Sequence, residues 1–161
     1  KELNPSIEFL IIGPIPELER NQHWGNVSFA GERSRSEIPA LLSAGSIGIS
    51  LMKSMDSTKV AMPAKVYEYI GMGLPIVVAP EGELHDFITT RKMGLAFKKM
   101  DINQIAQSIV DLEKDKARYE QFQSQIHSVR DQFDRKNQSV DMADLIEKYF
   151  VSVESKRENL S

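Results

Sequence analysis

Glu68 is a carboxylate in the middle of an expected helix, three residues after Lys65, in the segment MPAKVYEYIGMGLPIVVAP (residues 62–80). In a helix it points about 160° away from both Val66 and Ile70, so it faces away from the core if those two residues face it. Such a carboxylate can accept hydrogen bonds from ligand hydroxyls, for example a ribose diol. It can equally form an ordinary surface ion pair with Lys65.

The start of the same helix could bind an anion. Pro63 suits the first helical position, and a helix that begins there leaves the amides of Ala64, Lys65 and Val66 without partners inside the helix. The preceding Met62 has no side-chain oxygen that could cap these amides. Unpaired amides at the positive end of a helix dipole bind anions, phosphate above all, although water or a neighbouring loop would satisfy them as well.

Composition argues against several classes of function. The chain has 161 residues, of which 41% are hydrophobic and 27% charged, as in a soluble domain with a real core. Its formal charge of -3 gives no electrostatic footprint for nucleic acid. The absence of cysteine excludes disulfides, thiolate nucleophiles and cysteine-ligated metal sites. No apolar run is long enough to span a membrane and the N-terminal residues are unlike a signal peptide, so we expect a cytoplasmic protein.

Alternating strands and helices surround the segment of residues 62–80. Apolar runs bounded by glycine and proline predict strands over residues 7–12, 27–29, 46–52, 76–79 and 95–97. Helices are expected over residues 36–43 with Ser36 as cap, from Pro63 to Gly71 or Gly73, after Asp101, over residues 114–133 and after Ser139. This order indicates an α/β fold with a Rossmann-like, mostly parallel sheet flanked by helices.

The chain divides into a domain over residues 1–133, a C-terminal helix over residues 134–151 and a frayed tail over residues 152–161. Parallel sheets bind ligands beyond the carboxyl ends of their strands. That rule directs attention to the loops over residues 13–20, 31–35, 53–62 and 80–86. In the last of these, Gly82 could let the backbone approach a ligand closely.

Residues 62–80 resemble the donor-site segment of GT-B glycosyltransferases, in particular the retaining group called glycosyltransferase family 4. That group repeats the pattern Pro-x-Lys-x-x-Glu-Tyr-x-x-x-Gly-x-Pro-Val-Val. The pattern stands here as Pro63, Lys65, Glu68, Tyr69, Gly73, Pro75, Val77 and Val78. Shorter stretches, IEFLIIG, VSFAG, EIPALLSAGSIGISL and RKMGLAF, resemble further strands and helices of the family in the same order. The resemblance covers residues 7–112.

The resemblance implies a role for each of these positions. In the family, the glutamate equivalent to Glu68 binds the ribose hydroxyls of a sugar nucleotide, and the helix-start amides approach its diphosphate. The residues implied at the donor are Glu68 for the ribose, Pro63, Ala64, Lys65 and Val66 for the diphosphate, Gly13 near the phosphates, Gly31 and Arg33 near the base, and Gly82 beside the donor. The expected protein is the donor-binding C-terminal half of a retaining glycosyltransferase that uses a UDP-, GDP- or ADP-sugar without cofactor or metal. No catalytic residue is assigned in this chain.

This sequence departs from the family pattern in two ways. Many members carry a second glutamate eight residues before the ribose-binding one, where it contacts the transferred sugar, and this chain has Val60 there. The family's C-terminal domain also opens with a strand and a helix that supply an arginine and a lysine to the diphosphate, and this chain begins after them. We therefore expect a sheet without its first strand, a missing N-terminal acceptor domain through which a peripheral membrane contact could arise, and no sugar transfer by this chain alone. Unpaired strand edges favour association, so we expect the chain to dimerise or another segment to fill the gap.

Two rival functions stay open. A GT-B sugar-nucleotide epimerase would reuse the same helix and ribose carboxylate. A non-enzymatic α/β binding or regulatory module is the alternative from a different class. A receiver-like module is disfavoured because it needs acidic residues at its strand ends, where this chain has Gly13, Gly31, Met52 and Pro80.

Overall fold

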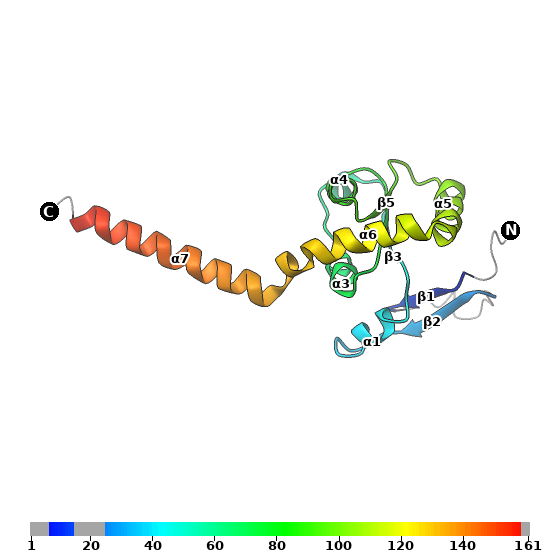
Figure 1. Cartoon of the computed structure of the whole chain (residues 1–161), viewed down its shortest axis with the longest axis horizontal. Helices are drawn as coiled ribbons and strands as arrows, with labels where there is room; N and C mark the ends of the chain where they lie inside the picture. The colour runs from blue at the N-terminus through cyan, green and yellow to red at the C-terminus, as the bar shows by residue number, and fades with distance from the viewer. Residues whose placement is uncertain (1–6, 15–24, 159–161) are drawn as a thin grey trace.

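The computed structural model of the protein describes residues 7–14 and 25–158, with side chains as far as Phe150. Within them the chain alternates between strands and helices, as the sequence predicts (Figure 1). The elements are β1 Phe9–Ile12, β2 Val27–Gly31, α1 Ile38–Leu42, β3 Gly48–Leu51, α2 Asp56–Lys59, α3 Ala64–Met72, β4 Ile76–Ala79, α4 Glu83–Arg91, β5 Gly94–Ala96, α5 Ile102–Lys114, α6 Lys116–Val129, the 3-10 helix η2 Arg130–Phe133 and α7 Arg135–Glu158. The loop predicted over residues 13–20 lies outside the described residues beyond Pro14.

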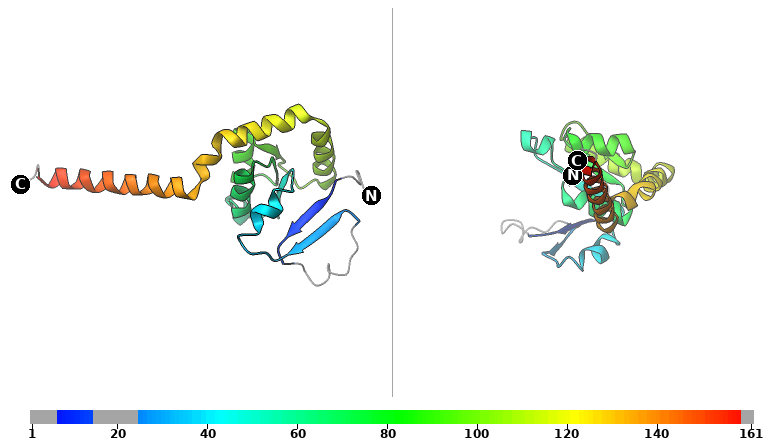
Figure 2. Two further views of the ribbon diagram at one scale, coloured as in Figure 1. Left: turned by 60° about the horizontal axis from the view of Figure 1, so that its bottom comes forward. Right: turned by 90° about the vertical axis from the view of Figure 1, so that its left-hand side faces the viewer.

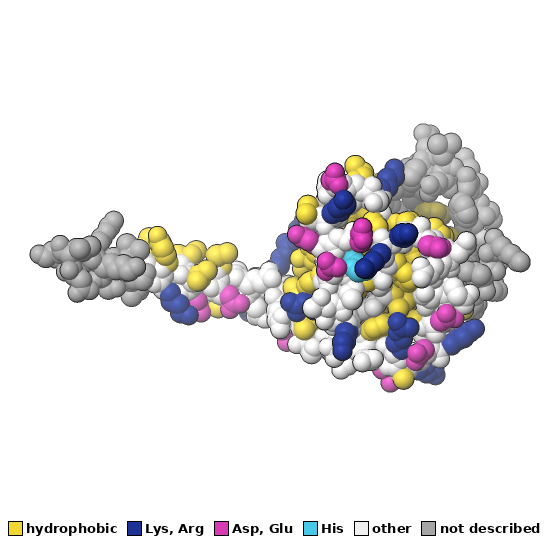
Figure 3. Space-filling view, turned by 90° about the horizontal axis from the view of Figure 1, so that it is seen from above, with side chains coloured by type: hydrophobic (Ala, Val, Ile, Leu, Met, Phe, Trp, Pro, Cys, Tyr) yellow, Lys and Arg dark blue, Asp and Glu magenta, His cyan; other side chains and the backbone are white. Residues whose placement is uncertain are grey.

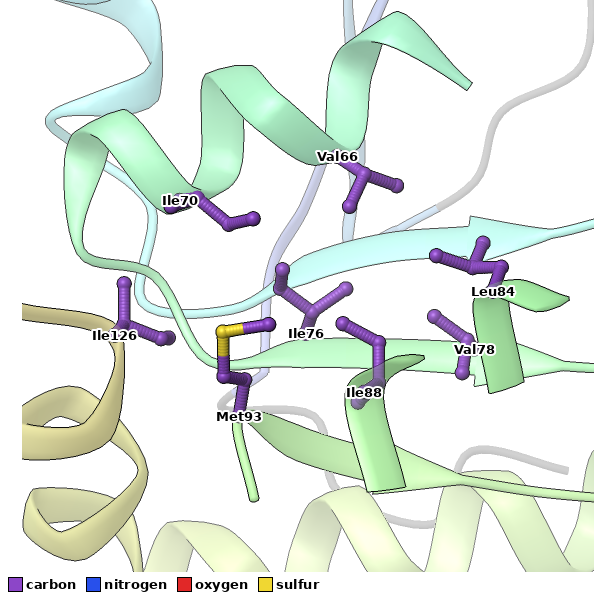
Figure 4. Packing of buried hydrophobic residues seen from close by; sticks show 8 residues of the cluster. All are labelled: Val66, Ile70, Ile76, Val78, Leu84, Ile88, Met93 and Ile126. Atoms are coloured by element: carbon purple, nitrogen blue, oxygen red, sulfur yellow. The ribbon is translucent and has the colours of Figure 1, made fainter. Parts of the chain in front are cut away.

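The main sheet consists of β3, β4 and β5 in that order, all parallel, so β4 lies at its centre. Every residue of β4 (IVVA) is buried, as expected for a parallel strand covered by helices on both faces. Ile76 and Val78 face α3 and α4, where they pack against Val66, Ile70 and Ile88 (Figure 4).

The other face of the main sheet is covered by α5. Val77 of β4 packs there with Ile105 and Leu112. Helix α6 contributes Ile126 to the first face and Phe122 to the second, so it connects the two layers. The start of α5 also agrees with the sequence, because the Asp101 carboxylate accepts a hydrogen bond from the Gln104 amide at 3.0 Å.

Strands β1 and β2 form a separate parallel pair to one side of the main sheet (Figures 1 and 2). Among the described residues, no hydrogen bond joins this pair to β3, β4 or β5. Phe9, Leu10 and Ile11 of β1 are 36–44% exposed although they are apolar. An exposed apolar strand of this kind favours association with another strand.

Helix α7 extends away from the rest of the molecule (Figures 1 and 2). The Asp134 carboxylate caps it by accepting hydrogen bonds from the amides of Lys136 and Asn137 at 2.8 and 3.1 Å. Ser139, the expected cap, instead donates to the Lys136 carbonyl. Helical backbone continues to Glu158, past the start of the frayed tail expected from residue 152. Exposed apolar side chains gather along one side of α7 (Figure 3).

Four other local predictions differ from the structure. Glu37 rather than Ser36 occupies the N-cap of α1. Pro63 is the N-cap of α3 with an extended ψ of 137°, so the helix begins one residue later, at Ala64. The loop expected over residues 80–86 ends early because α4 starts at Glu83, and the loop over residues 53–62 contains the single turn α2.

Replacing Gly48 by alanine should destabilise the protein by about 1–3 kcal/mol, because a methyl group there would overlap the Tyr69 ring of α3. Gly71→Ala is the matched control on α3. A methyl at residue 71 meets nothing within 4 Å, and alanine favours the helix by about 0.5–1 kcal/mol. Urea unfolding of both variants measures the difference. Equal midpoints for wild type and Gly48→Ala would show that α3 does not pack this closely.

Candidate functional site

The start of α3 lies over the carboxyl ends of β3 and β4. Val66, in the first turn of α3, lies on the side of Val78 near the end of β4, and Ile70 lies farther back toward Ile76 (Figure 4). The helix therefore runs opposite to the strand, with its positive end at the edge where parallel sheets bind ligands.

The start of α3 offers two open amides. The amides of Ala64 and Lys65 have no acceptor among the described residues, and no side chain caps the helix. The Val66 amide donates to the Pro63 carbonyl at 3.0 Å. The expectation of three open amides is therefore wrong for Val66, because the first turn of α3 closes with a 3-10-type hydrogen bond between residues three positions apart.

Glu68 is exposed on the outer side of α3, while Val66 and Ile70 are fully buried, as the sequence predicts. Neither Glu68 nor Lys65 forms an ion pair with another described residue. The surface ion pair that would have explained both residues is thus absent there. The Glu68 carboxylate keeps its capacity to accept hydrogen bonds from a ligand.

Tyr69 fixes the rotation of α3. Its ring packs directly on the α-carbon of Gly48 in β3, and its hydroxyl donates to the Ile49 carbonyl at 3.3 Å. Burial raises the pKa of Tyr69, and the nearby negative charge of Glu68 acts in the same direction. With Tyr69 held against β3, the neighbouring Glu68 must point outward.

Gly82 holds two loops of the candidate site together. Its φ of 149° is in the region that favours glycine, and a Cβ placed on it would lie 2.6 Å from the Lys59 carbonyl oxygen. The backbone of Lys59, at the end of α2, thus approaches Gly82 closely. Val60 directly follows Lys59 in this loop and is 65% exposed, so an apolar side chain lines this part of the carboxyl edge of the sheet.

The remaining predicted residues belong to the other sheet. The Gly13 amide donates to the Gly31 carbonyl at 2.9 Å, which places both glycines at the ends of β1 and β2. Arg33 donates to the Ala30 carbonyl at 2.8 Å and lies 3.6 Å from a Glu37 carboxylate oxygen. Its charge is therefore already partnered. No hydrogen bond among the described residues connects these positions with the start of α3.

The pKa of Glu37 is lowered mainly by hydrogen bonds from the Ser34 hydroxyl and amide, and less by Arg33. This local network holds the Arg33 loop in shape. It gives Arg33 a structural role beside the role at the base that the resemblance implies.

The structure adds Lys98 and Lys99 to the edge. The Glu81 amide donates to the Lys98 carbonyl at 3.1 Å, so the loop after β5 meets the loop after β4, and both lysines are exposed. Their position directly after a strand was the signal that could have identified them. His85 is buried nearby at the start of α4, with Nδ1 2.9 Å from an Asp86 carboxylate oxygen.

The described residues contain no group of three side chains suited to hold a metal ion. They also contain no helix that is long and apolar enough to cross a membrane.

Parallel strands flanked by helices, with the start of α3 at the carboxyl edge of the main sheet, define a Rossmann-like α/β domain. The sequence profile of the family described as glycosyl transferases group 1 matches residues 1–115. The chain therefore belongs to this family, and the resemblance found in the sequence is confirmed. No curated protein and no solved structure matches the chain.

Tyr69→Phe should reduce the loss of stability at alkaline pH. Because the pKa of Tyr69 is raised in the folded state, the unfolded chain ionises first, near pH 10, and stability falls from there until the folded-state pKa is passed. Phenylalanine removes this contribution. Thermal melts between about pH 8 and 11 measure how steeply stability falls with pH. Tyr67→Phe removes an exposed phenol from the same helix and should keep the wild-type slope; equal slopes in all three proteins would contradict the burial of Tyr69.

Proposed function

We propose that the start of α3 binds the nucleotide-sugar donor of a retaining glycosyltransferase, which transfers the sugar to an acceptor held by another domain. The observation that carries the proposal is the presence of two open amides and an unpaired, exposed Glu68 on one helix at the ligand-binding edge. The amides of Ala64 and Lys65 bind the diphosphate. Glu68 accepts hydrogen bonds from the ribose hydroxyls.

The spacing on α3 supports this division of roles. Glu68 lies four residues after Ala64, which is about 6 Å along the helix axis. A ribose follows its diphosphate directly, so one donor molecule can reach both positions. Tyr69 supports the geometry by fixing the rotation of α3.

The charge of the diphosphate is balanced by the helix dipole and by Lys65, which has no ion-pair partner among the described residues. Lys98 and Lys99 stand at the same edge of the sheet. Such fixed positive charges stabilise the leaving diphosphate as the bond to the sugar breaks. On this proposal the chemistry needs no metal ion or other cofactor.

Val60 is the reason to consider a second function, that of a sugar-nucleotide epimerase. Its exposed apolar side chain offers no acceptor for a sugar hydroxyl at the position where many family members have a glutamate. A sugar-nucleotide epimerase would share the donor site without needing a glutamate at residue 60 to accept a hydrogen bond from the sugar. Product analysis on the protein together with its other domain separates the two, as a glycosylated acceptor or an epimerised donor.

Glu68→Ala should abolish most donor binding. Loss of hydrogen bonds from a diol to a carboxylate costs about 1.5–3 kcal/mol, which weakens affinity by about tenfold or more. UDP-, GDP- and ADP-sugars are tested in turn by thermal shift. A donor at 100 times its Kd should stabilise the wild type by about 2.7 kcal/mol.

Glu120→Ala, on the exposed side of α6, is the matched control and should respond to donors like the wild type. The proposal fails if none of the three donor classes raises the melting temperature of the wild type. It also fails if Glu68→Ala is stabilised as strongly as Glu120→Ala.

We also propose that the open edge of β1 takes up a further strand, from a second copy of the chain or from another segment of the protein. Leu10→Lys places a charge on this exposed strand and should shift the chain toward monomer in sedimentation velocity. Leu145→Lys, on the exposed apolar side of α7, is the control. Loss of association in the control alone would place the contact on α7 and contradict a role for β1.

A further inference from the structure

A cavity of about 340 Å³ lies beside β5, away from the start of α3. Its lining comes from α4 on one face of the main sheet, from α5 on the other face, and from α6. A cavity lined from both faces lies at the lateral edge of the sheet, where β5 is the end strand of the described part. No residue of α3 lines it, so it is separate from the candidate donor site.

Two cations and no carboxylate line this cavity. Lys92 stands at the end of α4 and Arg118 in the first turn of α6, and neither forms an ion pair with a described residue. The Arg118 guanidinium is held 5.5 Å from the centre of the Phe122 ring. Lys92 has a φ of 53°, in the left-handed region where helix ends usually carry glycine or asparagine.

The cavity also offers uncharged hydrogen-bonding groups. The side chains of Ser108 and Gln121 form no hydrogen bond with other described residues. The Phe97 amide donates to the Val78 carbonyl of β4 at 3.0 Å, and successive residues of a strand direct their amides to opposite sides. The Ala96 amide therefore points to the open side of β5, toward the cavity.

We propose that this cavity binds a small organic oxyanion, a carboxylate or phosphate joined to a flat apolar group. Lys92 and Arg118 bind the oxyanion by charge-assisted hydrogen bonds. The apolar group packs against Phe97 and Phe122, which line the same cavity. Cavities that hold small ligands begin at about 300 Å³, so the volume admits a single ring with its anionic group.

Phenyl phosphate is the probe, and its binding is followed by the backbone amide signals of the ¹⁵N-labelled chain. The amide signals of Gly94, Ala96 and Arg118 should shift as phenyl phosphate is added, and the shifts should reach a plateau at high phenyl phosphate concentration. Lys92→Asn and Arg118→Gln should each raise the Kd about tenfold. Lys116→Gln removes an exposed cation from α6 outside the cavity and should leave the Kd unchanged.

Lys92→Asn keeps the test independent of folding because asparagine tolerates the left-handed backbone, whereas Arg118→Gln also removes the contact with Phe122. Benzoate and inorganic phosphate are tested as two further ligands in the same experiment. Tighter binding of phenyl phosphate than of inorganic phosphate supports the apolar subsite, and benzoate shows whether a carboxylate suffices. The proposal is overturned if the shifts lie outside the cavity, or if Lys116→Gln weakens binding as much as the two lining variants.

Discussion

The close approach of α3 to β3 is the contact on which the candidate site depends. Tyr69 lies where a side chain on residue 48 would have to stand, so the helix reaches this position only because residue 48 is glycine. Once Tyr69 and Ile70 are turned into the sheet, Glu68 must face outward. The same contact holds the start of α3 over the ends of β3 and β4. One packing constraint therefore sets both the direction of the carboxylate and the position of the open amides.

The other end of α3 is fixed by a second glycine. Gly73 ends the helix with a φ of 73°, and a Cβ there would lie 3.1 Å from the His127 imidazole of α6. Gln123 of the same helix donates to the Gly73 carbonyl at 3.4 Å. Helix α3 is thus held against β3 by Tyr69 and against α6 at its C-terminal end. A helix start whose position is fixed in this way is preorganised, which lowers the entropy that a ligand must remove on binding.

The sequence predicts best where the signal is local. The buried run of β4, the stop at Gly73 and the cap by Asp101 each depend on a few neighbouring residues. Helix α4 was missed because Gly82 does not cap its start with a side chain, although Leu84 and Ile88 have helical spacing. The hydrogen bond that occupies the Val66 amide depends on how tightly the first turn of α3 closes, which the residue types do not determine.

Local sequence patterns do not predict which strands pair or which distant residues meet. The pattern predicts that β1 and β2 are strands, but their separation from the main sheet depends on which strands pair. The resemblance implies that Gly13, Gly31 and Arg33 lie beside the donor, and in the structure all three lie at the ends of the smaller sheet. The cavity beside β5 has no sequence signature because its cations come from two helices that only the fold brings together.

Strand β5 connects the two candidate sites. Phe97 lines the cavity, and the next residue, Lys98, accepts the hydrogen bond from Glu81 that joins the loops at the carboxyl edge. As the end strand of the described sheet, β5 is bonded to β4 alone. A ligand bound on its open side would add contacts to this strand, and Lys98 joins the strand to the loop that carries Glu81 and Gly82. Any such coupling acts equally in both directions, because linkage between two binding equilibria is reciprocal. An anion beside β5 that strengthens donor binding at α3 must therefore itself bind more tightly when the donor is present.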